Sequence, residues 1–325
     1  MNACSKFRAT LRPVALLMCG CVVAPSRVFA HDDAQLQPSN LLLAWSWEPW
    51  IIAALIATAV LYSRGTLQLR RTSASSGSLP GWQVASFAVG WLTLVITLLS
   101  PLHKLGAALF SAHMTQHELL MLIAAPLLVM GRPLIAFVWA LPQRWRIRLG
   151  RVVKSKWISS PWQSISAPLA VWLIHGSTLW MWHIPTLYQA TLNSELVHAL
   201  QHATFLITAL LFWFTLIHGR YGRMGYGVAV LYVFTTAVHT SILGALLTFA
   251  QNIWYPIYET RTAPWGLSPI EDQQLGGVIM WVPAGVVFIV IGLALFAAWL
   301  GESERRLTFT RTATLLQPSI GDDHA

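Results

Sequence analysis

Charged side chains are scarce in this sequence. Lys, Arg, Asp and Glu make up 10% of its 325 residues, and 55% of the residues are hydrophobic. An average soluble domain carries about 25% charged residues, so this chain has too few ionised groups to cover a globular surface. The composition therefore predicts an integral membrane protein with several spans.

Cysteine is nearly absent, and its three copies all lie within the first 21 residues. The same segment has the three parts of a secretory signal, namely basic residues, the apolar run PVALLMCGCVVA and the small-residue cleavage site VFA before His31. We therefore expect residues 1–30 to be a signal peptide that is cleaved. The mature chain would then contain neither a disulfide nor a thiolate metal ligand.

The sequence also lacks the common signatures of soluble catalysis. It contains no Gly-rich phosphate loop, no GxSxG motif and no soluble domain of useful size. It shows no internal repeat of the kind found in transporters. Any function must then depend on side chains within or beside the predicted spans.

Apolar segments, by contrast, are abundant. A membrane helix needs about 20 apolar residues, and we count seven such segments after the signal peptide, the fourth of which is short. The fold class predicted is all-α, a polytopic bundle of seven transmembrane helices over residues 31–310, followed by a flexible cytoplasmic tail over 311–325. The expected spans are Trp47–Tyr62, Trp82–Ser100, Thr115–Val138, Ala167–Trp182, Leu196–Ile217, Gly227–Ala250 and Gly276–Leu300.

The third span contains a break signal. Arg132 and Pro133 interrupt it within the stretch MGRP, because a charge and a residue that cannot continue a helix favour the membrane surface. The apolar piece that follows, LIAFVWAL, would then lie along the interface.

The loop charges predict an orientation. Only Lys104 and Arg261 lie in the loops on one side of the predicted spans, whereas fourteen basic residues lie on the other. The positive-inside rule places those fourteen in the cytoplasm and the mature N-terminus outside. The net charge of +9 is explained in this way, and no nucleic-acid partner is expected. The fourteen residues are Arg64, Arg70, Arg71, Arg144, Arg146, Arg148, Arg151, Lys154, Lys156, Arg220, Arg223, Arg305, Arg306 and Arg311.

Histidines gather on the predicted outer side. Two pairs are spaced four apart, in HMTQHE and in HALQH, which places each pair on one helix face with Cβ atoms about 5–6 Å apart. Such a pair can bind one metal ion, and ionisable groups inside a bilayer are costly and usually functional. The alternative is that histidines bond neighbouring helices, which we favour for His175, His218 and His239. The outer group comprises His103, His113, His117, His183, His198 and His202.

We predict that five of these histidines are metal ligands: His113, His117, His183, His198 and His202. Met114, Glu118, Asp272 and Gln273 are expected as accessory residues. Asp272 could hold an imidazole N–H or could cap its own helix. Imidazoles suit copper, zinc or haem iron, and nearby thioethers tilt the choice toward Cu(I).

Four stretches together carry a family resemblance. They are HMTQHELLMLIAAPLLVMGRP, WHIPTLYQATLNSELVHALQH, GALLTFAQNIWYPIY and EDQQLGGVIMWVPAG, in this order. They resemble the polytopic CtaG family of cytochrome c oxidase assembly factors associated with caa-type oxidases, over about residues 40–300. The resemblance implies a membrane protein that helps to form the copper centre of the oxidase catalytic subunit. The family's histidine motifs correspond to the five predicted ligands, and DQQ to residues 272–274.

The leading hypothesis is a non-enzymatic maturation factor that holds copper transiently in the outward-facing histidine cluster. It would pass the ion to the catalytic subunit of a haem–copper oxidase within the lipid membrane. Three alternatives remain open at this point. One is a membrane metalloenzyme with Glu118 as general base, although HMTQHE lacks the internal Glu of HExxH. The others are a haem-binding electron carrier with paired axial histidines and a scaffold that binds no metal.

Overall fold

The computed structural model describes residues 36–72, 79–219 and 225–316, with side chains described as far as residue 304. The predicted signal peptide with all three cysteines lies outside the described residues, as do Arg220, Arg223 and residues 317–325.

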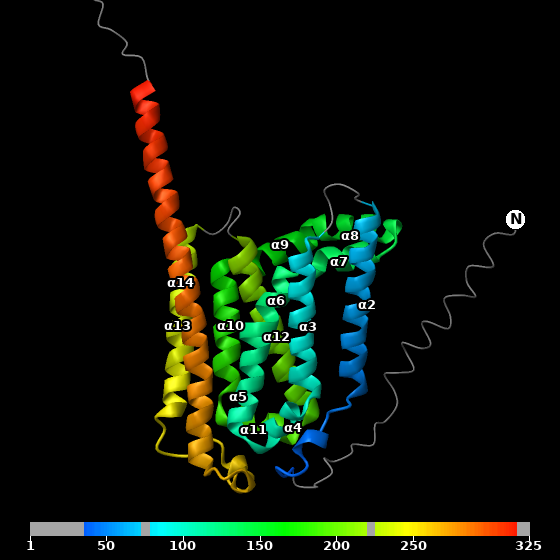
Figure 1. The fold of residues 1–325 in the computed structure, drawn as a ribbon, viewed down its shortest axis with the longest axis vertical. Helices are drawn as coiled ribbons and strands as arrows, with labels where there is room; N and C mark the ends of the chain where they lie inside the picture. Colours follow the sequence, from blue (N-terminus) through cyan, green and yellow to red (C-terminus); the bar gives the residue numbers. More distant parts are fainter. Residues whose placement is uncertain (1–35, 73–78, 220–224, 317–325) are drawn as a thin grey trace, which may run out of the picture. The chain divides into compact units, whose positions relative to one another are not determined.

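The described residues form helices joined by short connections, with no strand among them (Figure 1), so the predicted all-α class is confirmed. The longer helices are α2 (Pro49–Thr72), α3 (Gly81–Leu99), α10 (Pro168–Trp182), α12 (Glu195–His218), α13 (Tyr226–Thr248) and α14 (Pro269–Leu316). Shorter ones are α4 (Pro101–Ala108), α5 (Phe110–Glu118), the π-helical turn η2 (Leu119–Ala124), α6 (Ala125–Met130), α7 (Pro133–Ala140), α8 (Gln143–Lys154), α9 (Lys156–Ile165) and α11 (Pro185–Asn193). Single 3₁₀ turns are η1 (Leu41–Leu43), η4 (Pro256–Tyr258) and η5 (Ala263–Trp265).

Five helices in the described part of the chain are long and apolar enough to cross a membrane. They are α2, α3, α12, α13 and the segment Pro269–Glu304 of α14. The bent pair Phe110–Met130 and Pro133–Ala140 would make a sixth if it counts as one span. Helix α10 has 15 residues, a length of about 22 Å at 1.5 Å per residue. Helix α14 continues to Leu316, past residue 310, where we expected the helical bundle to end.

The break predicted at Arg132 is present. Arg132 has a left-handed backbone with φ of 49°, and α7 bends away from the preceding helix by 56°. Helix α7 then packs closely on α2, because a Cβ at Gly65 would come within 1.8 Å of the Ala136 carbonyl oxygen. The apolar stretch after the break therefore lies against another helix of the bundle.

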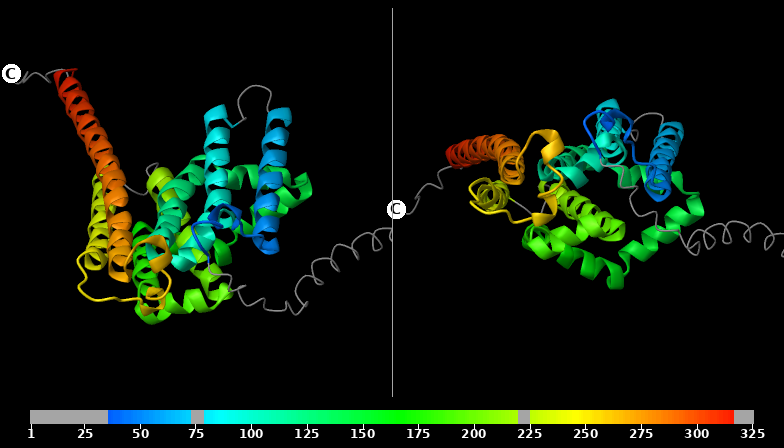
Figure 2. Two further views of the ribbon diagram at one scale, coloured as in Figure 1. Left: turned by 60° about the horizontal axis from the view of Figure 1, so that its bottom comes forward. Right: turned by 90° about the horizontal axis from the view of Figure 1, so that it is seen from below.

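The segment α5–η2–α6 lies at the centre of the packing. Its side chains contribute to three clusters of buried hydrophobic residues, with Met121 in one, Leu120 in the second and Met114 in the third. These clusters join it to α10 and α12, to α2 and α3, and to α13 and α14. Figure 2 shows α13 and α14 side by side at one edge and α2 at another. Polar residues on α5 are thus enclosed by helices on several sides.

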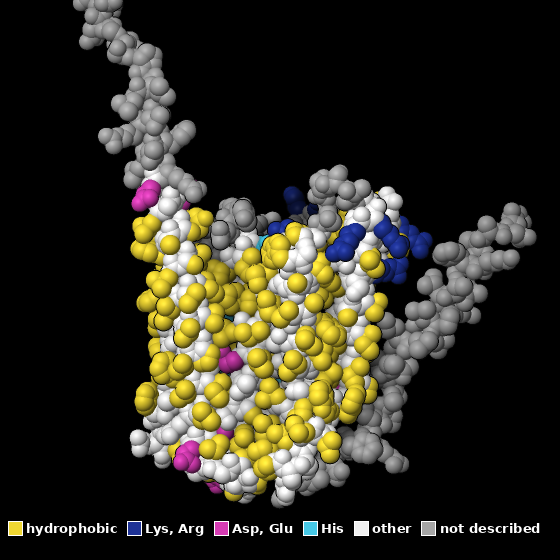
Figure 3. Space-filling view, viewed as in Figure 1, with side chains coloured by type: hydrophobic (Ala, Val, Ile, Leu, Met, Phe, Trp, Pro, Cys, Tyr) yellow, Lys and Arg dark blue, Asp and Glu magenta, His cyan; other side chains and the backbone are white. Residues whose placement is uncertain are grey.

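The two ends of the helices differ in chemistry. Helices α7, α8 and α9 lie at one end, and α4 and α11 lie at the other (Figure 1). Figure 3 shows Lys and Arg gathered at the α8 end, while hydrophobic side chains cover the middle of the visible face. The histidine-bearing ends of α5 and α12 adjoin α4 and α11, away from the basic residues of α8.

Candidate metal centre

The helix that carries HMTQHE is capped at its N-terminus by a carboxylate from a segment far away in the sequence. Leu109 is extended and separates α4 from α5, and Asp272 of α14 accepts hydrogen bonds from the Phe110 N–H at 2.6 Å and the Ser111 N–H at 3.1 Å. The Ser111 hydroxyl bonds to the same carboxylate. These bonds satisfy two of the free N–H groups at a helix N-terminus. Asp272 therefore fixes where α5 begins and how its histidines are presented.

Asp272 does not act as either sequence hypothesis expected. Its carboxylate caps α5 rather than holding an imidazole or capping its own helix. Gln273 likewise faces a loop, because its side chain accepts from the Trp254 N–H at 2.7 Å and donates to the Asn252 carbonyl at 3.2 Å. The DQQ motif therefore joins α14 to α5 and to the α13–α14 connection.

Helices α5 and α12 bring together an inner triad, defined as His113, His117 and His202. One nitrogen from each ring can be chosen so that the three lie within 4.8 Å of one another. The ring centroids of His113 and His117 are 4.5 Å apart, and that of His202 lies 5.3 Å from His117. All three side chains are buried, with exposed fractions of 0%, 2% and 6%. The two predicted pairs therefore face one another.

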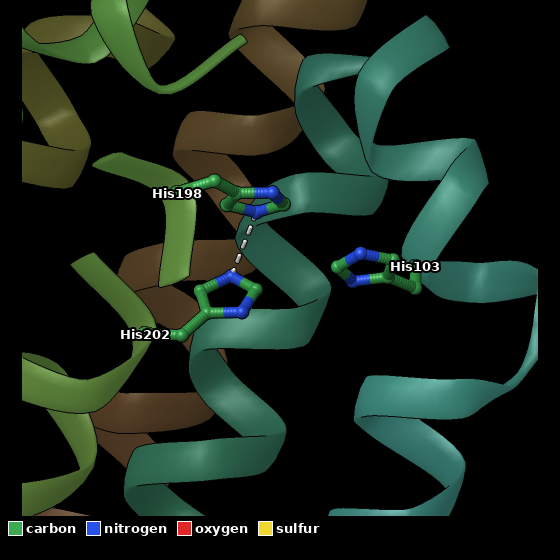
Figure 4. Close-up of side chains that lie close together, drawn as sticks. All are labelled: His103, His198 and His202. Atoms are coloured by element: carbon green, nitrogen blue, oxygen red, sulfur yellow. Dashed lines mark hydrogen bonds between the residues drawn. The ribbon is translucent and has the colours of Figure 1, made fainter. Parts of the chain in front are cut away.

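An outer triad adjoins the inner one. It consists of His103 of α4 with His198 and His202 of α12, and again one nitrogen from each lies within 4.8 Å of the others (Figure 4). The Nε2 atoms of His198 and His202 are 3.2 Å apart, and His103 stacks on His198 with ring centroids 5.1 Å apart. His202 belongs to both triads. His103, which was placed on this side but not predicted as a ligand, is thus a site residue.

His183 adjoins the same cluster. It ends α10, and its Nδ1 is 2.7 Å from the Leu179 carbonyl, so Nδ1–H donates and Nε2 is left as the free nitrogen. Its ring centroid lies 6.5 Å from that of His117. Burial lowers the pKa of His183 from 6.5 to about 4. The imidazole is therefore neutral near pH 7, which is the form that binds a metal ion.

Several buried nitrogens of the cluster have no hydrogen-bond partner. They are Nδ1 of His113, both ring nitrogens of His117 and Nε2 of His183. Buried polar atoms are normally paired, so each exception calls for an explanation. His113 does have one partner, because its Nε2 lies 3.1 Å from Oε1 of Gln201. The unpaired nitrogens are the right kind of donor for a transition metal ion.

A small cavity of about 30 Å³ adjoins His117. Met114, Glu118 and Met280 line it together with His175 and His183, and Oε2 of Glu118 is buried without a hydrogen-bond partner. This volume has room for about one water molecule or ion. The accessory residues Met114 and Glu118 are thus placed beside the cluster, and His175 reaches the same cavity.

Aromatic residues support the cluster from the loop side. Tyr188 packs on His113 with ring centroids 5.1 Å apart, and its hydroxyl is 2.9 Å from that of Tyr258. The Tyr258 hydroxyl donates to the Gly106 carbonyl at 2.9 Å, so the Tyr188 hydroxyl is the donor of the pair. Burial raises the pKa of Tyr258 well above its ordinary value, which keeps the hydroxyl protonated as a donor.

Sequence reasoning missed several polar partners of the histidines. Gln116 and Gln201 each stand next to a predicted ligand in the chain, and Glu48 lies at the start of the first predicted span, just before α2. Gln116 donates to the Thr97 carbonyl and to His103 Nδ1. A buried amide beside a histidine within an apolar segment was the available signal for these residues.

Comparison with known proteins shows to which family this chain belongs. The sequence model of the family described as cytochrome c oxidase caa3 assembly factor matches residues 60–302. The chain belongs to this family. The match contains the five histidines of the two triads as well as His183, and it confirms the family that the four sequence stretches resemble.

Curated relatives of this caa3 assembly factor family member include uncharacterized proteins of Mycobacterium tuberculosis and Mycobacterium bovis. Each is 26% identical to the chain over 276 residues, which cover 82% of the chain. An uncharacterized protein of Mycobacterium leprae is 25% identical over 285 residues, or 83% of the chain. The chain spans about two fifths of the length of these relatives, at 41% to 42%. No solved structure matches the chain.

Proposed function

We propose that this chain is a membrane-embedded, non-enzymatic assembly factor for a haem–copper oxidase. In this proposal the buried histidines hold copper as cargo and pass it to the catalytic subunit of the oxidase. Membership of the caa3 assembly factor family supports the assembly role. The histidine cluster supports the metal.

The inner triad is the observation that carries the metal proposal. Three imidazoles from two helices converge so that their nitrogens lie within 4.8 Å, and both nitrogens of His117 are buried without a hydrogen-bond partner. Leaving a buried polar group unpaired costs about 1–3 kcal/mol. A bound ion would remove this cost, because neutral imidazole nitrogens are good ligands for borderline and soft metal ions.

The surrounding donors favour copper over zinc. The described part of the chain contains no cysteine, and the thioethers of Met114 and Met280 line the cavity next to His117. Thioethers prefer Cu(I) among the ions that imidazole also binds. The copper would be held by His113, His117 and His202 and could be approached by His183 from the cavity side.

The proposed location is the inner membrane of a bacterial cell. We infer seven membrane crossings, with α10 as a short one and the α5–α7 segment as a bent one, after a cleaved signal peptide. The basic helix α8 would face the cytoplasm and the histidine cluster the outside, because Lys and Arg are retained on the cytoplasmic side. The N-terminus would then lie outside and the C-terminus inside. The copper ion would reach the oxidase within the plane of the membrane, where the two proteins contact each other.

A metal-dependent hydrolase is the second candidate, on the evidence of one residue. Glu118 follows His117 directly and reaches the same small cavity with an unpaired carboxylate oxygen, as a general base beside a metal-bound water would. A hydrolytic activity that Glu118→Gln abolishes while bound metal is retained would favour this function.

The test is the copper content of the purified full-length protein after anaerobic loading with Cu(I) and desalting. The wild-type protein is expected to retain copper at a fixed ratio, and the double variant His113→Gln/His117→Gln is expected to lose it. The matched control is His218→Gln/His239→Gln, which changes two histidines outside both triads and is expected to retain copper. Circular dichroism verifies that each variant is folded. Equal copper in the two double variants would contradict the ligand assignment, and a wild-type protein without copper would favour the scaffold alternative.

A further inference from the structure

The outer triad differs from the inner triad in its access to solvent. The His103 side chain is 13% exposed and pairs at 3.4 Å with Glu48, whose side chain is 25% exposed. His113 and His117 of the inner triad have exposed fractions of only 0% and 2%. An ion arriving from the aqueous side would therefore meet the outer triad first.

The partners of His103 fix the state of its ring. The amide nitrogen of Gln116 can only donate, so His103 Nδ1 accepts its hydrogen bond at 3.3 Å. The proton of the neutral ring is then on Nε2, the atom that faces the Glu48 carboxylate at 3.4 Å. A carboxylate in this position orients the imidazole and adds a negative charge at the rim of the site. His103 would then bind the ion through Nδ1, once the Gln116 amide releases that nitrogen.

His202 connects the two triads. Its nitrogens are close enough to serve either group, its ring contacts His103 at 6.1 Å and His117 at 5.3 Å between centroids, and its Nε2 lies 3.2 Å from that of His198 (Figure 4). Two sites that share a ligand can exchange an ion without releasing it to water.

We propose that Glu48, His103, His198 and His202 form a loading site that captures copper at the solvent side and delivers it through His202 to His113 and His117. This proposal rests on the proposed function, because it needs the inner triad to bind copper. The transfer is a ligand exchange. Nitrogens of His103 and His198 leave the ion as those of His113 and His117 bind it, the oxidation state does not change, and no electron donor or acceptor is required.

The two sites predict different effects of their residues. Loss of an outer ligand slows the arrival of copper but leaves its final position intact, whereas loss of an inner ligand removes the final position. The Glu48 carboxylate also attracts a cation electrostatically, and such attraction raises association rates by about 10-fold or more. Loading should therefore depend on salt concentration in the wild-type protein and less so after Glu48→Gln.

The experiment measures the rate and the final amount of Cu(I) taken up by the full-length protein, reconstituted in lipid nanodiscs, from the cationic Cu(I)–acetonitrile complex, with the remaining free Cu(I) trapped by bicinchoninate at each time point. His103→Gln and Glu48→Gln are each expected to slow uptake about tenfold or more while reaching the wild-type amount of bound copper. Lys104→Gln is the matched control, because Lys104 is the exposed neighbour of His103, and it is expected to load at the wild-type rate or faster.

The outcomes separate the two proposals. Wild-type uptake of copper with an unchanged rate in both outer variants would overturn the loading site alone. Loss of the final copper in His103→Gln, to the level of His113→Gln/His117→Gln, would also overturn it, because the two triads would then be one site. A wild-type protein that takes up no copper would contradict the proposed function itself. Two independent outer variants, each verified as folded by circular dichroism, keep the result from depending on one substitution.

Discussion

The surroundings of His117 support the proposal that the cluster binds a metal ion. Its ring lies against His113, His202 and Phe205, with centroids 4.5, 5.3 and 4.6 Å away, and neither of its nitrogens has a hydrogen-bond partner. A leucine in this position would fill similar space without leaving polar atoms unpaired, which costs about 1–3 kcal/mol each. The energetic cost of the imidazole is offset if it binds an ion.

A first prediction concerns Asp272, whose carboxylate holds the start of α5. The substitution Asp272→Asn keeps the size of the side chain but replaces one acceptor oxygen by a donor, which opposes the Phe110 or Ser111 N–H. We expect a loss of about 1–2 kcal/mol in stability, as for other helix caps, and weaker copper retention because α5 carries His113 and His117.

The measurement is the thermal unfolding midpoint of the protein in detergent, monitored by circular dichroism. Glu259→Gln is the control, since it removes an exposed carboxylate of the α13–α14 connection and should leave the midpoint unchanged. An Asp272→Asn midpoint equal to that of the control would show that the cap does not stabilise α5.

At the level of single residues the sequence predicted the paired histidines and not their partners. The i,i+4 spacing fixes one helix face for His113 with His117 and for His198 with His202, and both pairs do meet. His103 could not be assigned, because α4 is a short helix whose rotation depends on contacts with distant segments. Asp272 was assigned to the wrong partner, since its bonds to α5 join residues more than 160 positions apart in the chain.

The central segment combines an α-helix, a π-helical turn and a second α-helix. Glu118 ends α5, and the π-helical residues Leu119–Ala124 follow directly. A π turn inserts extra length into the helical repeat and often occurs at functional sites. Here the π turn lies between α5, which carries His113 and His117, and the apolar helix α6. The side chains of α5 and α6 can therefore face different neighbouring helices.

A second prediction concerns the close contact between α13 and α14. A Cβ at Gly277 would lie 2.6 Å from the backbone nitrogen and the hydroxyl oxygen of Thr248. Gly277→Ala must therefore push the two helices apart, and overpacking of this kind costs about 1–3 kcal/mol. We expect a lower thermal midpoint for the detergent-solubilised protein. Gly285→Ala is the control on the same helix, where a Cβ meets nothing within 4 Å, and a similar fall for both variants would contradict the contact.

At the level of elements, hydropathy located the helices well and their ends poorly. Each expected span from Trp47–Tyr62 to Gly276–Leu300 overlaps a helix of the structure, and the break at Arg132 is present. The count of seven spans remains a prediction, since five helices, or six with the bent pair, qualify by length and composition. The short fourth span, Ala167–Trp182, agrees closely with α10, whereas α2 runs to Thr72 rather than Tyr62, because capping and packing with neighbouring helices decide where a helix stops.

The whole molecule separates a basic end from a histidine end, and this predicts its orientation. Ser155 joins α8 to α9 at the basic end, and Ser194 joins α11 to α12 beside the histidines. In cells whose outer membrane alone has been permeabilised, a membrane-impermeant maleimide should label Ser194→Cys. It should label Ser155→Cys only after the inner membrane is permeabilised as well. The unsubstituted chain measures labelling of the native cysteines. The reverse pattern would contradict the proposed orientation.

The central claim is that the histidine cluster supplies copper to an oxidase, and copper in the oxidase itself tests this claim most directly. The oxidase is purified from cells that carry the wild-type chain, His113→Gln/His117→Gln or the control His218→Gln/His239→Gln at equal levels, and its copper is measured per haem. We predict full copper with the wild-type chain and the control, and an oxidase that contains haem but is depleted of copper with His113→Gln/His117→Gln. An oxidase with the same copper per haem in all three strains would contradict the account.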